Sequence, residues 1–79
     1  MERETILSDI NLIFIETLDD EEIVINETTN ADDVEDWDSL THIQLVVAVE
    51  KSFSIKFSSN EIQSWKNVGE MIDCIVKHS

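Results

Sequence analysis

The sequence predicts an all-α fold built from three main helices and one short helix, with a long loop after the first. Proline is absent and glycine occurs once, so little in the chain interrupts a helix. Apolar residues recur at spacings of three and four along three segments, which is the period of a helix face. The hydrophobic fraction of 42% over 79 residues fits one small folded domain, residues 1–79, and argues against disorder.

The first helix is predicted from Glu2 to about Leu18. Glu2 and Glu4 fall in its first turn, where the helix dipole favours acidic side chains. Leu12 and Ile15 fall outside the apolar face. The face itself is expected to consist of Ile6, Ile10, Ile13, Phe14 and Thr17 or Leu18, widened by Leu7.

Residues 19–38 are predicted to form a long acidic loop. A loop of this length in a small domain is either functional or held by its own apolar residues, and Ile23, Ile25 and Val34 are the candidates. No register of the loop matches an EF-hand, so we do not expect calcium binding by that motif. The single cysteine and two scattered histidines do not make a zinc site, so no metal is expected.

The second helix is predicted from Ser39 to about Ser52, with Asp38 or Ser39 as its N-cap. Its apolar residues fall on two separate arcs. We expect one arc to face the core and the other to face another protein; the alternative is that both arcs are core. The expected core arc is Leu45, Val46, Val49 and Phe53, and the expected partner arc is Leu40, Ile43 and Val47.

Two short patterns predict the remaining helices. Ser58 to Glu61 has the form of a capping box and opens a short helix that contains Ile62 and Trp65. The segment 67–70 opens the last helix in the same way. Cys74 lies off its apolar face and is interpreted as a partly exposed thiol, with dimer formation through it left open. The core stripe of this helix is expected to be Val68, Met71, Ile72, Ile75 and Val76.

The net charge of −13 is confined to the first half of the chain. Residues 1–38 hold 14 acids and one base, whereas residues 39–79 hold four of each. Such a field repels nucleic acid and anionic membranes and attracts basic protein surfaces; alternatively it serves solubility alone. No apolar run approaches about 18 residues and the N-terminus does not resemble a signal peptide, so we expect a cytoplasmic monomer without membrane insertion.

The sequence does not favour an enzyme. A nucleophilic serine needs a base that a third group orients, and His42, although near Ser39, has no assured partner of this kind. There is also no glycine-rich phosphate loop. What remains is a serine at a helix start, where a phosphate ester would lie at the favourable end of the helix dipole.

Two segments resemble the acyl carrier protein family: Trp37-Asp38-Ser39-Leu40, and the residues from Ile43 to Phe53. The resemblance implies a four-helix acyl-carrier-like bundle in which Ser39, flanked by Asp38 and Leu40, carries 4′-phosphopantetheine. A phosphopantetheinyl transferase would install this arm from coenzyme A, and acyl intermediates would ride on it as thioesters. The further partners that the resemblance implies are an acyl-loading ligase or acyltransferase and ketosynthase-type or acyl-transfer enzymes.

The chain departs from fatty-acid carriers around this serine. It has no glycine before Asp38, and Thr41 and Gln44 stand where acidic residues are usual. The motif Trp-Asp-Ser-Leu-Thr-His therefore resembles that of discrete carriers that serve specialised pathways, such as polyketide-like, amino-acyl or cell-surface acylation systems. The expected partner surface is Trp37, Leu40, Ile43, Val47, Glu50 and Phe57.

The resemblance also places several residues around the space where some carriers shelter acyl chains. Because Trp65 is bulky, we expect little room there and a cargo that is short or stays outside; simple core packing is the alternative. The rival function is an unmodified helical interaction module that uses the same surface. The residues concerned with this space are Val49, Phe57, Ile62, Trp65 and Met71.

Overall fold

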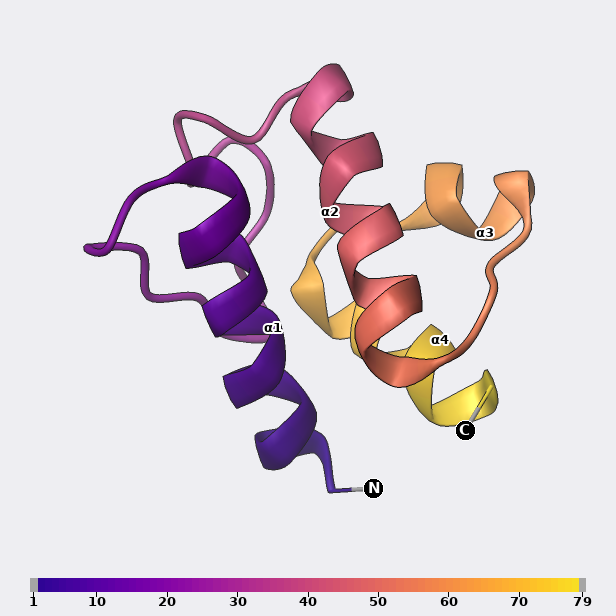
Figure 1. The fold of residues 1–79 in the computed structure, drawn as a ribbon. Helices are drawn as coiled ribbons and strands as arrows, with labels where there is room; N and C mark the ends of the chain where they lie inside the picture. The colour runs from indigo at the N-terminus through magenta and orange to yellow at the C-terminus, as the bar shows by residue number, and fades with distance from the viewer. Residues whose placement is uncertain (1, 79) are drawn as a thin grey trace.

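The protein is described by a computed structural model covering residues 2–78, and these residues contain four helices and no strand. The helices are α1 (Arg3–Leu18), α2 (Ser39–Phe53), α3 (Ser59–Ser64) and α4 (Val68–His78). In Figure 1, α1 and α2 stand beside each other, α4 passes behind the lower part of α2, and the short α3 is on the far side of α2 from α1. The predicted fold class, with three main helices, one short helix and a long first loop, is confirmed.

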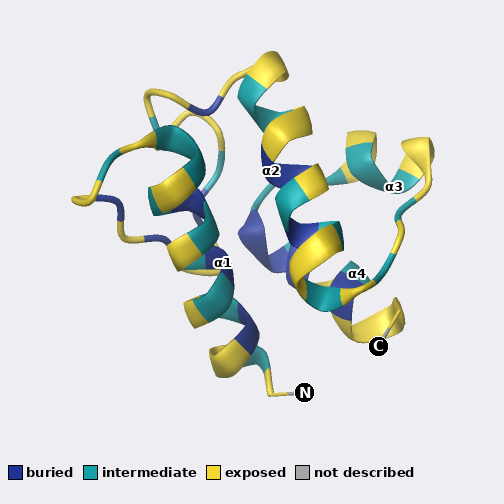
Figure 2. Cartoon of the chain, in the orientation of Figure 1, coloured by how far each residue is buried: buried dark blue, intermediate teal, exposed yellow. Residues whose placement is uncertain are grey.

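The core is formed where α1, α2 and α4 each turn one apolar face inward (Figure 2). The predicted faces of α1 and α2 are confirmed in their central positions, since the residues in the middle of each face have no exposed surface. Burying side chains of this size is the main favourable contribution to folding. The fully buried set comprises Ile6, Ile10, Phe14, Leu45, Val49, Val68, Met71, Ile72 and Ile75.

Three positions at the edges of the predicted faces differ from expectation. Val76, expected in the core stripe of α4, is 41% exposed. At 100° per residue it lies about 80° round the helix from Val68, at the margin of the stripe. Phe53 and Ile15 are both half-buried: the first was expected in the core and the second outside it.

The long loop is held to α1 by alternating residues. Ile23 and Ile25 are buried, whereas Val24 between them is 86% exposed. The Asn11 side chain pairs with both inward residues: its Oδ1 accepts from the Ile25 N–H at 2.7 Å and its Nδ2 donates to the Ile23 carbonyl at 3.3 Å. Val34 packs half-buried against the core. The prediction that these apolar residues pin the loop is confirmed.

The same loop also receives the start of α4. The N–H of Val68 donates to the Thr29 carbonyl at 2.9 Å, and the N–H of Gly69 donates to the Glu27 carbonyl at 2.8 Å. These bonds satisfy first-turn donors that have no partner within a helix. A Cβ atom at position 69 would lie 2.8 Å from the Glu27 carbonyl oxygen, so the chain's one glycine stands where the backbones approach too closely for a side chain.

Arg3 joins three parts of the chain. Its guanidinium pairs with the Glu27 carboxylate, donates to Asp73 Oδ1 at 2.6 Å and donates to the Gly69 carbonyl at 3.2 Å. The hydrogen bonds to Glu27 and Asp73 raise the pKa of Arg3, and the one from Arg3 lowers the pKa of Glu27. The start of α1, the loop and α4 therefore meet at one cation. Among residues 2–78, no helix combines the length and apolar character needed to cross a membrane.

Candidate functional site

Asp38 caps the N-terminus of α2. Its Oδ1 accepts hydrogen bonds from the backbone N–H groups of Leu40 and Thr41, both at 3.0 Å. Thr41 returns the contact, because its hydroxyl accepts from the Asp38 N–H at 2.8 Å and donates to the Asp36 carbonyl at 2.7 Å. Of the two candidate caps, Asp38 is therefore the one used. Thr41 completes the box, a role that the Asp-x-x-Thr spacing could have indicated.

The cap keeps a negative charge at the start of α2. The backbone N–H of Thr41, followed by the Thr41 hydroxyl and the Leu40 N–H, lowers the pKa of the Asp38 carboxyl below its usual range. A carboxylate at this position also interacts favourably with the positive end of the helix dipole. Asp38 is thus fixed and ionised immediately before Ser39.

Ser39, the first residue of α2, is exposed. Within the part of the chain that the structure describes, its hydroxyl has no hydrogen-bond partner, because the capping is done by its neighbours. A nucleophilic serine would be expected to donate to a base. The geometry therefore leaves the Ser39 oxygen available to be modified rather than activated.

His42 has both ring nitrogens engaged elsewhere. Its Nδ1 lies 3.0 Å from Trp37 Nε1, and its Nε2 lies 3.2 Å from the carbonyl oxygen of Ile62. Because an indole N–H only donates, Nδ1 must accept, and Nε2 then donates to the carbonyl. This arrangement uses the neutral ring in full, so His42 connects the loop, α2 and α3 and is not a base for Ser39.

Trp37, expected at the partner surface, lies in the core instead and is only 7% exposed. Its ring meets Phe14 edge-on with centroids 5.0 Å apart and stacks on His42 at 6.0 Å. The hydrogen bond to His42 satisfies the indole N–H, which makes the burial possible. Trp37 therefore supports the start of α2 from beneath.

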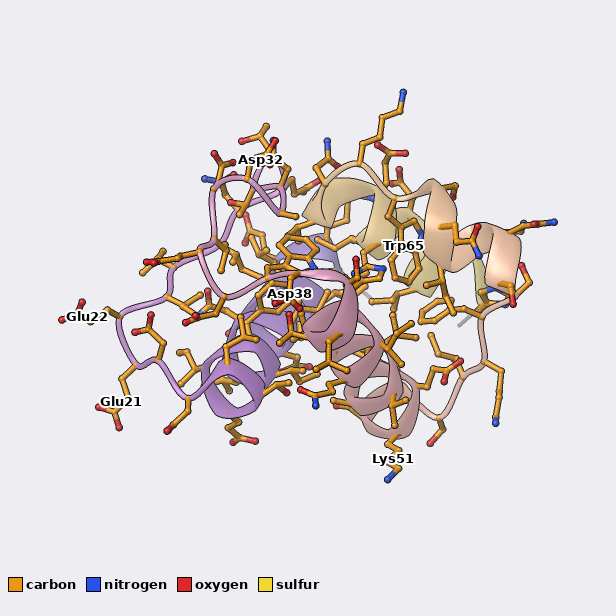
Figure 3. All side chains as sticks on the ribbon, turned by 90° about the horizontal axis from the view of Figure 1, so that it is seen from above. Glu21, Glu22, Asp32, Asp38, Lys51 and Trp65 are labelled. Carbon is orange, nitrogen blue, oxygen red and sulfur yellow. The ribbon has the colours of Figure 1, made fainter. Side chains whose placement is uncertain are left out.

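A second group of rings fills the space on the α3 side of α2. Trp65, expected inside the short helix, is its C-cap instead, and it meets Phe57 at 4.9 Å and His42 at 5.9 Å. Its Nε1 donates to the Sγ of Cys74 at 3.0 Å, which ties it to α4. Figure 3 shows Trp65 between α2 and α3. Phe57, expected at the partner surface, is half-buried against this ring.

Three apolar side chains stand in a row on the outer face of α2, and we call them the α2 strip: Leu40, Ile43 and Val47. Their exposed fractions are 71%, 54% and 43%, so the alternative that both arcs of α2 are core is wrong. Glu50, expected as the charged contact beside the strip, accepts a hydrogen bond from the Phe57 N–H at 2.8 Å. Its carboxylate is therefore partly used within the chain.

A groove of about 560 Å³ opens beside Ser39. Its wall includes Ser39, His42 and Ile43 from α2 and Trp65 and Lys66 from the segment after α3. A group attached to the Ser39 oxygen can therefore lie along the protein surface with both apolar and polar neighbours. Among the described residues, no three His, Cys, Asp or Glu side chains gather in a way that would hold a metal ion.

Comparison with known proteins agrees with this geometry. The model of the family described as "Phosphopantetheine attachment site" matches residues 9–75. The solution NMR structure of a holo acyl carrier protein from Geobacter metallireducens is 40% identical, has a TM-score of 0.85, and aligns over 91% of this chain and 83% of that one. The crystal structure of an acyl carrier protein from Thermotoga maritima, at 24% identity and a TM-score of 0.86 over 99% of this chain and 91% of that one, shows the same fold.

The residues at the start of α2 fit 4′-phosphopantetheine, the group whose attachment defines this family. An exposed hydroxyl without a partner stands at a helix start, and a groove that could receive an attached arm begins beside it. Bound 4′-phosphopantetheine supplies the thiol on which acyl groups are carried, so a protein of this kind is a carrier and not an enzyme. On the family match and the shared fold together, the chain belongs to the acyl carrier protein family.

Proposed function

We propose that Ser39 is the attachment point and that the protein carries acyl intermediates as thioesters on a 4′-phosphopantetheine arm. The observation that carries the proposal is the Ser39 hydroxyl, which is exposed and free of hydrogen bonds to described residues while Asp38 and Thr41 do the capping. In this proposal, a phosphopantetheinyl transferase catalyses attack of the Ser39 oxygen on the phosphorus of coenzyme A that bears the pantetheine. The P–O bond of the pyrophosphate breaks, adenosine 3′,5′-bisphosphate leaves, and the hydroxyl proton is released. Ser39 is then joined to phosphopantetheine by a phosphodiester. Asp38 and Leu40 flank the modified oxygen and lie within reach of that enzyme.

We propose further that the pathway is a specialised one, of the polyketide-like, amino-acyl or cell-surface acylation type. Support comes from the uncharged Thr41 and Gln44 on α2 and from the zero net charge of residues 39–79. The partners would then be a loading ligase or acyltransferase and ketosynthase-type or acyl-transfer enzymes. They would bind the α2 strip, whose apolar residues are exposed beside Ser39. The cytoplasmic location stays a prediction.

We also propose that the cargo is short or remains outside the bundle. The space between α2, α3 and α4 is occupied by Trp65, whose ring contacts those of Phe57 and His42. Val49 and Met71, which the resemblance also places around this space, have no exposed surface. A long acyl chain would have to displace packed rings whose polar atoms are already paired, and displacing well-packed groups is costly.

Intact-mass measurement tests the attachment. The protein is incubated with coenzyme A and a promiscuous phosphopantetheinyl transferase, and we expect a gain equal to one phosphopantetheine. Ser39→Ala should abolish the gain, whereas Ser52→Ala, which alters another exposed serine of α2, should retain it. Absence of any gain would support the rival function, an unmodified helical interaction module; a gain that survives Ser39→Ala would place the attachment elsewhere.

A further inference from the structure

We propose that a second groove, at the C-terminal end of α2, binds an apolar segment flanked by carboxylates on the partner enzyme. This inference rests on the proposed carrier function, since it concerns how a partner of the loaded protein docks. We call the groove the lysine groove. It measures about 420 Å³ and is lined by Val47, Glu50, Lys51, Ser54, Ile55 and Lys56.

The lysines of this groove are unusual in so acidic a chain. The protein has 18 acidic residues and five lysines and arginines. Arg3 is paired with Glu27 and Asp73, and Lys77 lies 3.9 Å from Glu61. In the described part of the chain, the other three lysines form no ion pair, and two of these three rim the lysine groove. Carboxylates are plentiful in the protein, yet they leave Lys51 and Lys56 available to another molecule.

The local charge of the groove is opposite in sign to that of the whole protein. Glu50 is the one acid in its wall, and its Oε2 is held by the Phe57 N–H at 2.8 Å. Lys51 projects from α2 at the end remote from Asp38 (Figure 3). The two residues are thirteen positions apart, or about 20 Å along a helix, whereas the screening length at physiological salt is about 8 Å. Asp38 therefore does not cancel the charge of Lys51, and with two lysines against one acid in its wall the groove favours carboxylates.

The floor of the groove selects for apolar side chains as well. Val47 belongs both to the groove and to the α2 strip, and Ile55 lies half-buried beside it. A partner that approaches the arm on Ser39 would cover the strip and reach the groove with the same surface. The occupant is therefore a segment of that partner protein, because Val47 joins the groove to the strip that the partner covers.

Two synthetic peptides test the proposal with the full 79-residue protein. Both form amphipathic helices with the same leucine face; one has glutamates beside the leucines and the other has lysines. Amide chemical shifts map each contact, and fluorescence anisotropy measures each affinity. We expect the glutamate peptide to shift amides from Val47 to Lys56. The lysine peptide should instead shift those of the acidic loop, residues 19–38.

Charge reversal separates the groove from the overall field. The double substitution Lys51→Glu with Lys56→Glu should lower the affinity for the glutamate peptide by about fivefold or more. The matched control, Lys66→Glu with Lys77→Glu, changes the net charge equally and should have a smaller effect. An equal loss of affinity for the glutamate peptide in both double variants would overturn the proposal. So would a glutamate peptide that leaves the amide shifts of the groove unchanged. The Lys51→Glu, Lys56→Glu variant should still be loaded at Ser39, so a failure of loading in the unaltered protein would count against the carrier function and not against the groove.

Discussion

The cap of α2 depends on the hydroxyl of Thr41. This oxygen accepts from the Asp38 N–H and donates to the Asp36 carbonyl, so it links the end of the loop to the first turn of the helix. Thr41→Val keeps the shape of the side chain and removes both bonds. We expect the free energy of unfolding in urea to fall by about 1 kcal/mol, the usual cost of a lost cap.

The control for this change is Thr5→Val, which alters an exposed threonine of α1 whose hydroxyl has no hydrogen-bond partner among the described residues. Its unfolding midpoint should hardly move. Equal loss in both variants would mean that valine is poorly tolerated in these helices and that the Thr41 bonds contribute little. Loading of Ser39 should persist in the Thr41 variant, because the Ser39 oxygen takes no part in the cap.

For individual residues, the sequence predicted that Ser39 and Asp38 lie at the start of a helix, but it did not predict which side chains surround them. Local patterns are enough to place a cap beside a helix start, since the partners lie within three residues. Trp37 was misplaced because its burial depends on Phe14 and His42, which belong to other segments. Glu50 was expected to be free because its partner, the Phe57 N–H, is brought near only when the chain turns after α2.

Among the elements, the short helix α3 depends on ionised Glu61. Its carboxylate accepts from the Ser58 N–H at 2.9 Å and lies 2.9 Å from His78 Nε2, and these contacts lower the pKa of Glu61 from 4.5 to about 2. Because the folded pKa is the lower one, the stabilising contribution is complete above pH 4.5 and is lost as the pH falls through about 2. We expect the carboxyl carbon of Glu61 to titrate near pH 2 by NMR.

Comparison with Glu61→Gln isolates this contribution from those of the other acids. Glutamine still accepts a hydrogen bond but does not titrate, so the variant should lose less stability than the unaltered protein between pH 4.5 and 2. Urea unfolding at several pH values measures the difference. Titration of Glu61 near 4.5, with parallel stability curves, would show that the capping box of α3 is not formed in solution.

The rings between α2, α3 and α4 set the prediction about cargo. The protein is loaded at Ser39 with acetyl- or octanoyl-phosphopantetheine, and amide shifts are compared. We expect the amide shifts of Val49 and Met71 to be the same in the two forms. The reason is that Trp65, packed against Phe57 and His42, blocks entry of the acyl chain to these buried residues. Trp65→Leu removes ring volume, so the octanoyl form of this variant should shift both amides. The substitution should also lower the free energy of unfolding by about 2 kcal/mol.

Leu12→Ala serves as the control, since Leu12 is exposed on α1 and takes no part in this space. Large shifts at Val49 and Met71 in the unaltered octanoyl protein would show that the rings yield to the chain. The cargo proposal would then be wrong, while attachment at Ser39 would stand.

The spacing of apolar residues predicted which residues are buried at the centre of each helix face, but was less accurate at the margins of the face. The two arcs of α2 could be separated by angle alone, and their opposite exposure follows from having one core on one side. Trp65 was assigned to the short helix because capping residues mark where a helix begins more clearly than where a six-residue helix ends. The space that Trp65 fills is made by three helices at once, so spacing along the chain could not show it.

For the whole molecule, the net charge of −13 makes the acidic side chains repel one another. The chain measures 28 × 24 × 22 Å, whereas the screening length is about 30 Å at 0.01 M salt and about 8 Å at 0.15 M. At low salt every acid therefore repels every other across the fold, and at physiological salt only near neighbours interact. The ion pairs of Arg3 act in the opposite sense, because salt weakens their attraction.

We expect repulsion to dominate, since 18 acids face five lysines and arginines and the Arg3 contacts are exposed. The urea midpoint of unfolding should rise as sodium chloride increases from about 0.01 to 0.15 M. Arg3→Gln removes the main attractive contacts and raises the net negative charge, so its midpoint should be lower and its rise with salt steeper. Lys66→Gln makes the same charge change without breaking an ion pair between described residues, so its dependence on salt should stay closer to that of the unaltered protein. A midpoint that falls with salt in the unaltered protein would mean that Arg3, by joining α1, the loop and α4, outweighs the repulsion of the acidic half.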